Sequence, residues 1–265
     1  PGARVAILAP LGPEAVLSVL ACLRAGLSPM LMPMHGNELE LLRLIEATDA
    51  VMALGVARVG PLRPLLILRE LAVRAFGTRF VGGFGAEVPD GIAPLDKLMD
   101  SATLHPLAEV ERRAGLQVVD GATMSGPVEI SERDVLGKAL EISRLLKPME
   151  SSRIVTTLVG GDLAALASGP AMAMLTGVEL LPLGLFSLGD LQACIEGGRN
   201  VHLVLPGAME PALAQSRLAS HPALASLVFV QRPAGSRALP AIDRPDVAIV
   251  DIDVAGAAEI SVSRR

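Results

Sequence analysis

Residues 121–126 combine the residue types that loops use to hold phosphate groups. Small and hydroxyl-bearing side chains are concentrated at Gly121, Thr123, Ser125 and Gly126. In phosphate-binding loops, backbone N–H groups and hydroxyls surround the anion, and a lysine offsets its charge. This stretch follows the apolar run 116–119, but no basic residue precedes Arg133 in this part of the chain. The pattern therefore predicts the remnant of a nucleotide loop without its cation.

The elements that must position this loop alternate between short apolar runs and helical apolar patterns. In the first half, strand-like runs at 3–10, 27–34 and 49–55 alternate with helical patterns at 12–26 and 36–48. In the second half, strand-like runs at 152–160, 178–184 and 200–207 alternate with helical patterns at 161–177 and 187–198. Such alternation predicts an α/β fold with mainly parallel sheets and helices on their faces.

The two halves repeat one plan. Arg4 and Pro33 in the first half match Arg153 and Pro182 in the second, each 149 positions later. We interpret this as a duplication that produces two similar, doubly wound βαβαβ subdomains. Residues 1–115 are assigned to the first subdomain, and residues 116–265, with the altered phosphate loop, to the second.

Composition excludes some classes of partner. The net charge of -5, the absence of Trp and Tyr and the presence of only five Phe argue against a nucleic-acid partner. The uncharged stretch 163–178 is too short for a membrane span and is interrupted by Gly169 and Pro170, so we expect a buried helix there. Cys22 and Cys194 lie in apolar helical patterns typical of free thiols, which indicates a reducing cytoplasm.

Other motifs are weaker. The run 81–88 has Gly83 and Gly85 in the spacing of a dinucleotide fingerprint, but Val88 stands at its sixth position, so a glycine turn is the favoured interpretation. The sequence has no metal-ligand spacing of Cys and His. We expect structural or solvated roles for all four histidines, which are His35, His105, His202 and His221.

In the opening half, Pro13 and Glu14 begin the first helical pattern, the run 21–26 ends it, and Pro33 lies in the next strand-like run. In this order of features the opening half resembles the large N-terminal domain of the adenylate-forming acyl-CoA synthetase superfamily. In that family a strand precedes an N-x-P-E helix, an A-x-L-x-A-G helix end and a proline-containing strand. Pro13 and Glu14, the run 21–26 and Pro33 match these features in order. The resemblance covers nearly the whole chain. It implies two similar subdomains with ligands between them and, for an active member, an acid–thiol ligase that uses ATP, Mg²⁺ and CoA.

The same resemblance identifies which site motifs are altered. The family's phosphate loop, S-G-T-[ST]-G-x-P-K-G, corresponds to the lysine-free run 120–127. Its adenine-wall motif, G-G-A-P-L, corresponds to "RPAGS" at 232–236. Its Y-G-x-T-E motif corresponds to "AGAAE", which keeps Gly256 and Glu259 but loses the Tyr and the Thr. Glu259 is a candidate ligand of Mg²⁺, and the alternative is a solvated side chain.

The resemblance places the acyl-binding side near Gly160, Gly161 and Asp162. A strand end, two glycines and an Asp suited to cap the next helix would let backbone approach a ligand there. The alternative is that the glycines make the strand-to-helix turn and that Asp162 only caps the helix.

Three interpretations follow. The leading one is a non-catalytic relative of the ligase N-terminal domain, with no resident cofactor, that binds a small carboxylate or acyl ligand or serves as a scaffold or partner, in a homo-oligomer or beside an active ligase subunit. The second is a divergent ATP-dependent ligase completed by a C-terminal domain beyond these 265 residues. The third is a purely structural α/β domain.

Overall fold

The structure is a computed structural model that describes residues 2–101, 115–120, 124, 126–184, 186–232, 242 and 244–265. Contacts within the chain group into two compact units. The first unit comprises residues 1–132 and 159–162, and the second comprises residues 133–158 and 163–265. Residues 116–132 belong to the first unit, although the sequence pattern assigns them to the second, because strands in this stretch pair with the first sheet.

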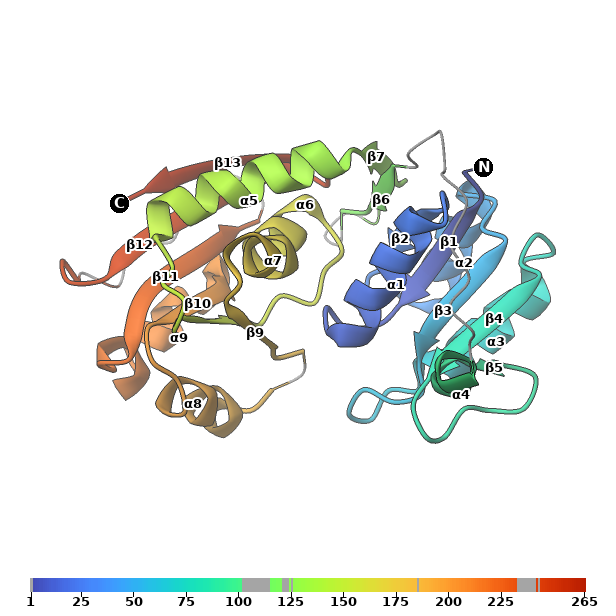
Figure 1. The fold of residues 1–265 in the computed structure, drawn as a ribbon, viewed down its shortest axis with the longest axis horizontal. Helices are drawn as coiled ribbons and strands as arrows, with labels where there is room; N and C mark the ends of the chain where they lie inside the picture. Colours follow the sequence, from blue (N-terminus) through green and yellow to red (C-terminus); the bar gives the residue numbers. More distant parts are fainter. Residues whose placement is uncertain are drawn as a thin grey trace. The chain divides into compact units, whose positions relative to one another are not determined.

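In the described residues of the first unit, seven strands form a sheet in the order β5-β4-β3-β1-β2-β6-β7 (Figure 1). The strands are β1 (Arg4–Leu8), β2 (Ser28–Leu31), β3 (Met52–Val56), β4 (Phe80–Phe84), β5 (Ala93–Pro94), β6 (Leu116–Val118) and β7 (Val128–Ile130). The helices are α1 (Pro13–Arg24), α2 (Glu38–Ala47), α3 (Pro64–Arg74) and α4 (Leu95–Ser101). All neighbouring strands pair in parallel except β6 and β7, which are antiparallel.

Local sequence explains where the first helices begin and end. Pro13 is suited to the first turn of α1 because that turn needs no donor from its N–H, and Gly26 follows the helix with a φ of 71°. Helix α2 begins with a capping box. The Glu40 N–H donates to Asn37 Oδ1 at 3.0 Å, and the Asn37 N–H donates to Glu40 Oε2 at 2.9 Å. The helix predicted at 36–48 is confirmed.

In the described residues of the second unit, six strands form a sheet in the order β13-β12-β11-β10-β8-β9. The strands are β8 (Arg153–Thr156), β9 (Glu179–Pro182), β10 (Val201–Pro206), β11 (Leu224–Gln231), β12 (Ala248–Gly256) and β13 (Glu259–Arg264). The sheet is parallel from β9 to β12, and β13 returns antiparallel to β12.

The helices of the second unit include a buried, irregular one between β8 and β9. The helical segments are α5 (Glu132–Leu146), α6 (Leu163–Leu166), η1 (Ala167–Ala171), α7 (Met172–Thr176), α8 (Leu188–Glu196), η2 (Gly207–Met209), α9 (Glu210–Ala214) and η3 (Arg217–Ser220). Segment η1 is a π-helix that contains Pro170, and residues 163–173 are buried. A wider turn accommodates a residue that has no N–H to donate. The expected buried helix is confirmed, and none of the described helices is both long and apolar enough to cross a membrane.

The two sheets share one strand order. Strands β5-β4-β3-β1-β2 of the first correspond to β12-β11-β10-β8-β9 of the second, all parallel, which confirms the two similar subdomains. The number of residues between equivalent positions of the two units is less constant than predicted. Arg4 pairs with Ser28, whereas Arg153 pairs with Glu179, so the offset rises from 149 at the first strand to 151 at the second. Pro33 is therefore not the equivalent of Pro182, because the segment between β8 and β9 is two residues longer.

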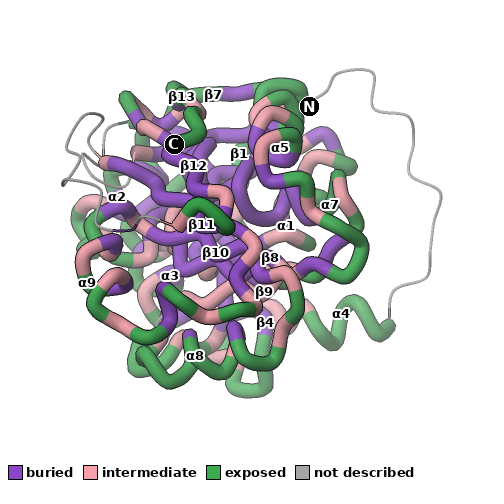
Figure 2. The backbone as a smooth tube through the Cα atoms, turned by 90° about the vertical axis from the view of Figure 1, so that its left-hand side faces the viewer, coloured by how far each residue is buried: buried purple, intermediate pink, exposed green. Residues whose placement is uncertain are grey.

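Each unit has its own apolar core, seen as buried stretches along the strands in Figure 2. The first core lies between the first sheet and its helices, and its largest buried members are Leu8, Met30, Met32, Leu41, Ile45, Leu65, Leu68 and Leu71. The core of the second unit includes Leu203, Leu205, Leu227 and Phe229, none of which is exposed. Burial of these side chains is the main favourable contribution to the stability of each unit.

Candidate functional site

The described part of the predicted phosphate-loop remnant is anchored by a methionine. Gly121, Thr123 and Ser125 lie outside the described residues, but Met124 and Gly126 are described. Met124 has a φ of 48°, which is uncommon for a residue with a side chain, and its N–H donates to the Asp120 carbonyl at 2.8 Å. Its side chain packs on the first core, close to Gly36. The anchoring contact of the loop is therefore hydrophobic.

The remaining described positions of the loop supply no cation. Gly126 has a negative φ and no heavy atom within 4 Å of the position that a Cβ would occupy, so the backbone does not require glycine there. Val128 follows at the start of β7 and is 44% exposed. Between β6 and Arg133, the sequence offers neither Lys nor Arg to a phosphate.

Gly256 and Glu259 lie opposite each other where the β12–β13 hairpin closes. The Glu259 side chain is exposed. Between them, Ala257 is buried, and its carbonyl accepts a hydrogen bond from the Leu163 N–H at 3.0 Å. In the described residues, no group of three or more His, Cys, Asp or Glu side chains is placed to hold a metal ion. A role for Glu259 with Mg²⁺ stays a prediction.

Gly161 has a packing role in the first unit. A Cβ at this residue would lie 2.2 Å from the Leu31 Cβ and 2.7 Å from the Leu31 carbonyl oxygen, so the backbone of residue 161 lies directly against the end of β2. Asp162 is 1% exposed. Contact of Gly160, Gly161 or Asp162 with an acyl ligand stays a prediction, while the packing contact alone explains the glycine at 161.

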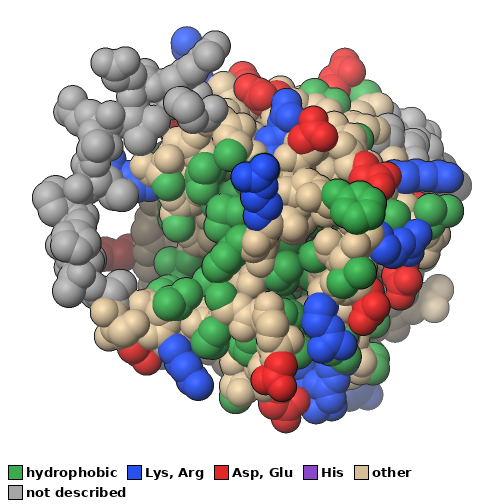
Figure 3. Space-filling view, turned by 90° about the vertical axis from the view of Figure 1, so that its right-hand side faces the viewer, with side chains coloured by type: hydrophobic (Ala, Val, Ile, Leu, Met, Phe, Trp, Pro, Cys, Tyr) green, Lys and Arg blue, Asp and Glu red, His purple; other side chains and the backbone are tan. Residues whose placement is uncertain are grey.

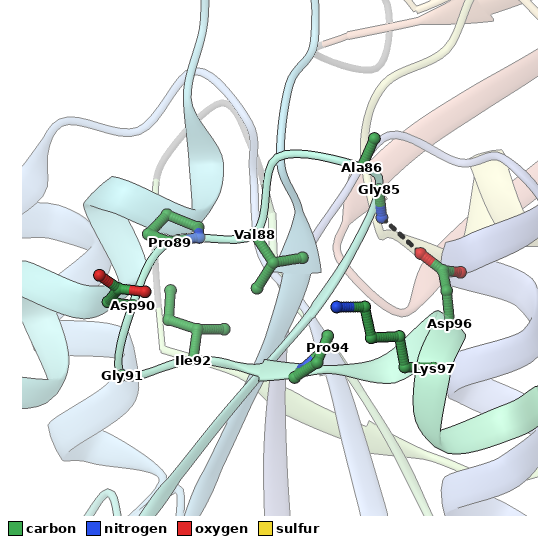
Figure 4. A pocket seen from close by; sticks show the side chains of 10 residues that line it. All are labelled: Gly85, Ala86, Val88, Pro89, Asp90, Gly91, Ile92, Pro94, Asp96 and Lys97. Carbon is green, nitrogen blue, oxygen red and sulfur yellow. Dashed lines mark hydrogen bonds between the residues drawn. The ribbon is translucent and has the colours of Figure 1, made fainter. Parts of the chain in front are cut away.

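A pocket of about 400 Å³ lies beside the carboxyl end of β4 in the first unit (Figure 4). Its lining includes Gly85, Val88, Ile92, Pro94, Asp96 and Lys97. Gly85 has a φ of 110°, and its N–H donates to Asp96 Oδ2 at 2.7 Å. The glycine turn expected there is confirmed at Gly85. The pocket itself was not predicted, because its walls come together only when β5 pairs with β4.

The second unit has a buried cluster of charged side chains that the sequence analysis missed. Arg265 Nε and Nη2 donate to the Asp251 carboxylate at 2.6 and 2.7 Å. Its Nη1 and Nη2 donate to Glu210 at 2.6 and 2.9 Å. Asp251 is 0% exposed and Glu210 is 2% exposed. The hydrogen bonds to Asp251, and then those to Glu210, hold the pKa of Arg265 above its ordinary value.

His202 is a core residue, as expected from the sequence. It lies on β10, and its Nδ1 is 2.8 Å from the Ser226 Oγ on β11. Burial lowers the pKa of His202 from 6.5 to about 4. The imidazole is therefore neutral at pH 7.

The face of the molecule in Figure 3 mixes the two signs of charge. Hydrophobic side chains are interspersed there with Lys and Arg and with Asp and Glu, and neither sign forms one continuous field. A continuous basic surface is the usual electrostatic mark of a nucleic-acid partner.

Comparisons with known proteins place the fold. No protein-family model and no curated protein matches the chain. Solved structures do match. MbtA from Mycobacterium smegmatis is 20% identical with a TM-score of 0.76, and the match covers 100% of this chain and 49% of MbtA.

Two further structures agree. A benzoate CoA ligase from Burkholderia xenovorans is 12% identical with a TM-score of 0.75, over 98% of this chain and 51% of the ligase. The inhibitor-bound N-terminal domain of FACL13 from Mycobacterium tuberculosis is 16% identical with a TM-score of 0.73, over 94% and 62%. The chain therefore has the α/β fold of the N-terminal domain of these proteins, and it spans about half the length of the MbtA and benzoate CoA ligase chains.

Proposed function

We propose that this chain is a non-adenylating relative of the acyl-CoA and aryl-acid ligases, in which the N-terminal fold serves to bind a small carboxylate or acyl ligand, or to partner an active ligase. The observation that carries the proposal is the loop between β6 and β7. This loop contains neither Lys nor Arg, and the Met124 side chain packs against the first core. The fold supports the relationship, and the loop supports the loss of nucleotide chemistry.

The physical argument concerns charge. Formation of an acyl adenylate requires a carboxylate and a polyphosphate, both anionic, to be held together while charge builds on the α-phosphate. Enzymes achieve this with preorganised donors and cations, and the loss of one donor typically slows the reaction about 10²- to 10³-fold. Here the loop lysine is missing, and Ala255 and Ala258 stand where the resemblance places a tyrosine and a threonine. We expect several such losses together to leave the site inactive in adenylation.

One observation favours a second candidate. The chain spans 49% of MbtA and 51% of the benzoate CoA ligase. A divergent ligase that draws its missing groups from a further domain is consistent with that coverage. The two candidates make opposite predictions for adenylation by the complete protein.

The experiment is carboxylate-dependent ATP–pyrophosphate exchange with the full-length protein and a panel of aliphatic and aromatic acids. We expect no exchange above a preparation from empty-vector cells, and an ATP dissociation constant weaker than about 1 mM by calorimetry. Exchange with any acid of the panel would overturn the proposal in favour of the divergent ligase.

Two variants at one position test whether the missing lysine explains the expected weak binding of ATP. Val128 directly follows Pro127, as the lysine follows the proline in the family's loop motif, and its side chain is exposed. Val128→Lys should therefore fold normally and bind ATP more tightly than Val128→Gln, which has a similar length and no charge. Equal ATP affinity in the two variants would show that the missing cation does not explain weak binding.

A further inference from the structure

We infer that the pocket beside β4 and α4 binds a small apolar carboxylate, with Lys97 as the counter-ion. The pocket lies within the first unit and uses none of residues 120–128 or 160–162. The inference therefore does not depend on the proposed loss of adenylation.

The cation of the pocket is placed to meet an anion. In Figure 4 the Lys97 side chain extends from α4 into the pocket, toward Val88 and Pro94. Among the ion pairs of the described residues, none involves Lys97. The neighbouring carboxylate of Asp96 already accepts the Gly85 N–H at 2.7 Å. Lys97 is exposed, so it would pair with a bound anion at the open side of the pocket, where water weakens the attraction.

The charge of the lining disfavours a doubly charged anion. Asp90 and Asp96 share the pocket with Lys97, so the lining carries two negative charges and one positive charge. The net negative lining repels a phosphate dianion more strongly than a single carboxylate, and Lys97 lies on the side of the pocket away from Asp90, where one carboxylate would pair with it (Figure 4).

The rest of the lining selects an apolar body. Ile92 is 6% exposed and belongs to the first core, and Val88 packs against that core. With Pro94 they form apolar walls at the base of the pocket. Its volume of about 400 Å³ is near the lower end of the range of about 300–1,000 Å³ for ligand pockets. A carboxylic acid with one aromatic ring or one short branched chain fits this volume.

The pocket is formed before any ligand arrives. Gly85 and Gly91 have φ values of 110° and 84°, conformations that residues with side chains rarely adopt. The Gly85 hydrogen bond to Asp96 joins the start of the loop to α4, and the Ile92 N–H donates to the Pro89 carbonyl at 3.2 Å. A fixed loop reduces the entropy that a ligand must offset on binding.

The chain offers a direct reporter of this site, because it has three lysines, which are Lys97, Lys138 and Lys147. In protein labelled with ¹³C at lysine Cε, benzoate and isovalerate should shift the Lys97 signal saturably, with dissociation constants in the millimolar range. Lys138, which pairs with Glu141 at 2.9 Å, and Lys147 should not move. Benzamide and inorganic phosphate should leave all three signals in place. Equal movement of the three lysines, or equal binding of benzamide, overturns the inference.

Two variants with opposite expected effects complete the test. Lys97→Met should weaken benzoate binding at least about tenfold, and Lys138→Met should leave it unchanged. Asp90→Asn removes a repelling carboxylate and should tighten benzoate binding, a gain that misfolding cannot imitate. An unchanged affinity in Lys97→Met, or no gain in Asp90→Asn, would contradict the site. ATP–pyrophosphate exchange reports on residues 120–128, so failure of either proposal is seen separately.

Discussion

Arg4 and Arg153 hold equivalent positions in the two units, and each donates a hydrogen bond to a carbonyl oxygen at the C-terminal end of an equivalent helix. Arg4 Nη1 reaches the carbonyl of Thr48, the C-cap of α2, at 3.0 Å. Arg153 Nη1 reaches the carbonyl of Cys194, near the end of α8, at 3.3 Å. A cation at this end of a helix satisfies unpaired carbonyls and opposes the helix dipole. The duplicated plan thus repeats a contact as well as a strand order.

Replacement of Arg153 should measure the strength of this contact. Arg153 also pairs with Glu179 at 2.6 Å, and its side chain is 20% exposed. We expect Arg153→Met to lower the free energy of unfolding by about 1–2 kcal/mol. Arg43→Met, at an exposed position inside α2 and outside its last turn, is the matched control and should change it by less than about 0.5 kcal/mol. If urea titrations show equal losses of stability in the two variants, the contact of Arg153 with the end of α8 does not contribute to stability.

His202 should make stability depend on pH below neutrality. Burial holds its pKa at about 4 in the folded chain against 6.5 when it is unfolded. The unfolded chain therefore binds more protons between these values, and the stabilisation present above pH 6.5 is lost as the pH falls toward 4. The loss from this residue is about 3 kcal/mol. In denaturant titrations the wild type should therefore lose about 3 kcal/mol more stability than His202→Met as the pH falls from 7 to 4, and parallel pH profiles would contradict the assignment.

Arg265 should be essential for the stability of the second unit. Its removal leaves the carboxylates of Glu210 and Asp251 buried without this cation. We expect Arg265→Met to lower the free energy of unfolding by about 3–5 kcal/mol at pH 7. Arg265→Met combined with Asp251→Asn should recover part of that loss, because one buried charge disappears. No recovery in the double variant would mean that the arginine acts through packing on Phe229, whose ring centroid lies 5.3 Å from the guanidinium carbon.

Two glycines should respond in opposite ways to alanine. Gly161→Ala forces a Cβ against Leu31 and should destabilise the protein by about 1–3 kcal/mol. Gly126→Ala has free space and a negative φ, so it should be neutral or slightly stabilising. Thermal unfolding of both variants without ligand checks this. A harmless Gly161→Ala would leave ligand contact as the better explanation of that glycine.

Patterns along the sequence predicted the features that depend on near neighbours. Alternation of apolar periods predicted the parallel sheets, and the helical pattern at 36–48 predicted α2, whose capping box is complete within four residues. The two-residue lengthening before β9 was not predicted, because a π-helix turn at Pro170 leaves the apolar character of the segment unchanged.

Features that depend on distant contacts could not be predicted in this way. Arg265 meets Glu210 and Asp251 only after β13 has paired with β12, and composition gives no sign of that partnership. Lys97 was not singled out, because a lysine in the first turn of a short helix is ordinarily a solvated surface residue. Its relation to the pocket arises from the pairing of β5 with β4.

The contact between Gly161 and Leu31 has a consequence for the order in which a ribosome completes the protein. Residues 159–162 belong to the first unit, yet α5 and β8 of the second unit precede them in the chain. Domains commonly fold from the N-terminus as they emerge. Here the first unit lacks its last segment until Asp162 has left the exit tunnel, when part of the second unit is already outside. Until then, the end of β2 at Leu31 lacks its contact with Gly161.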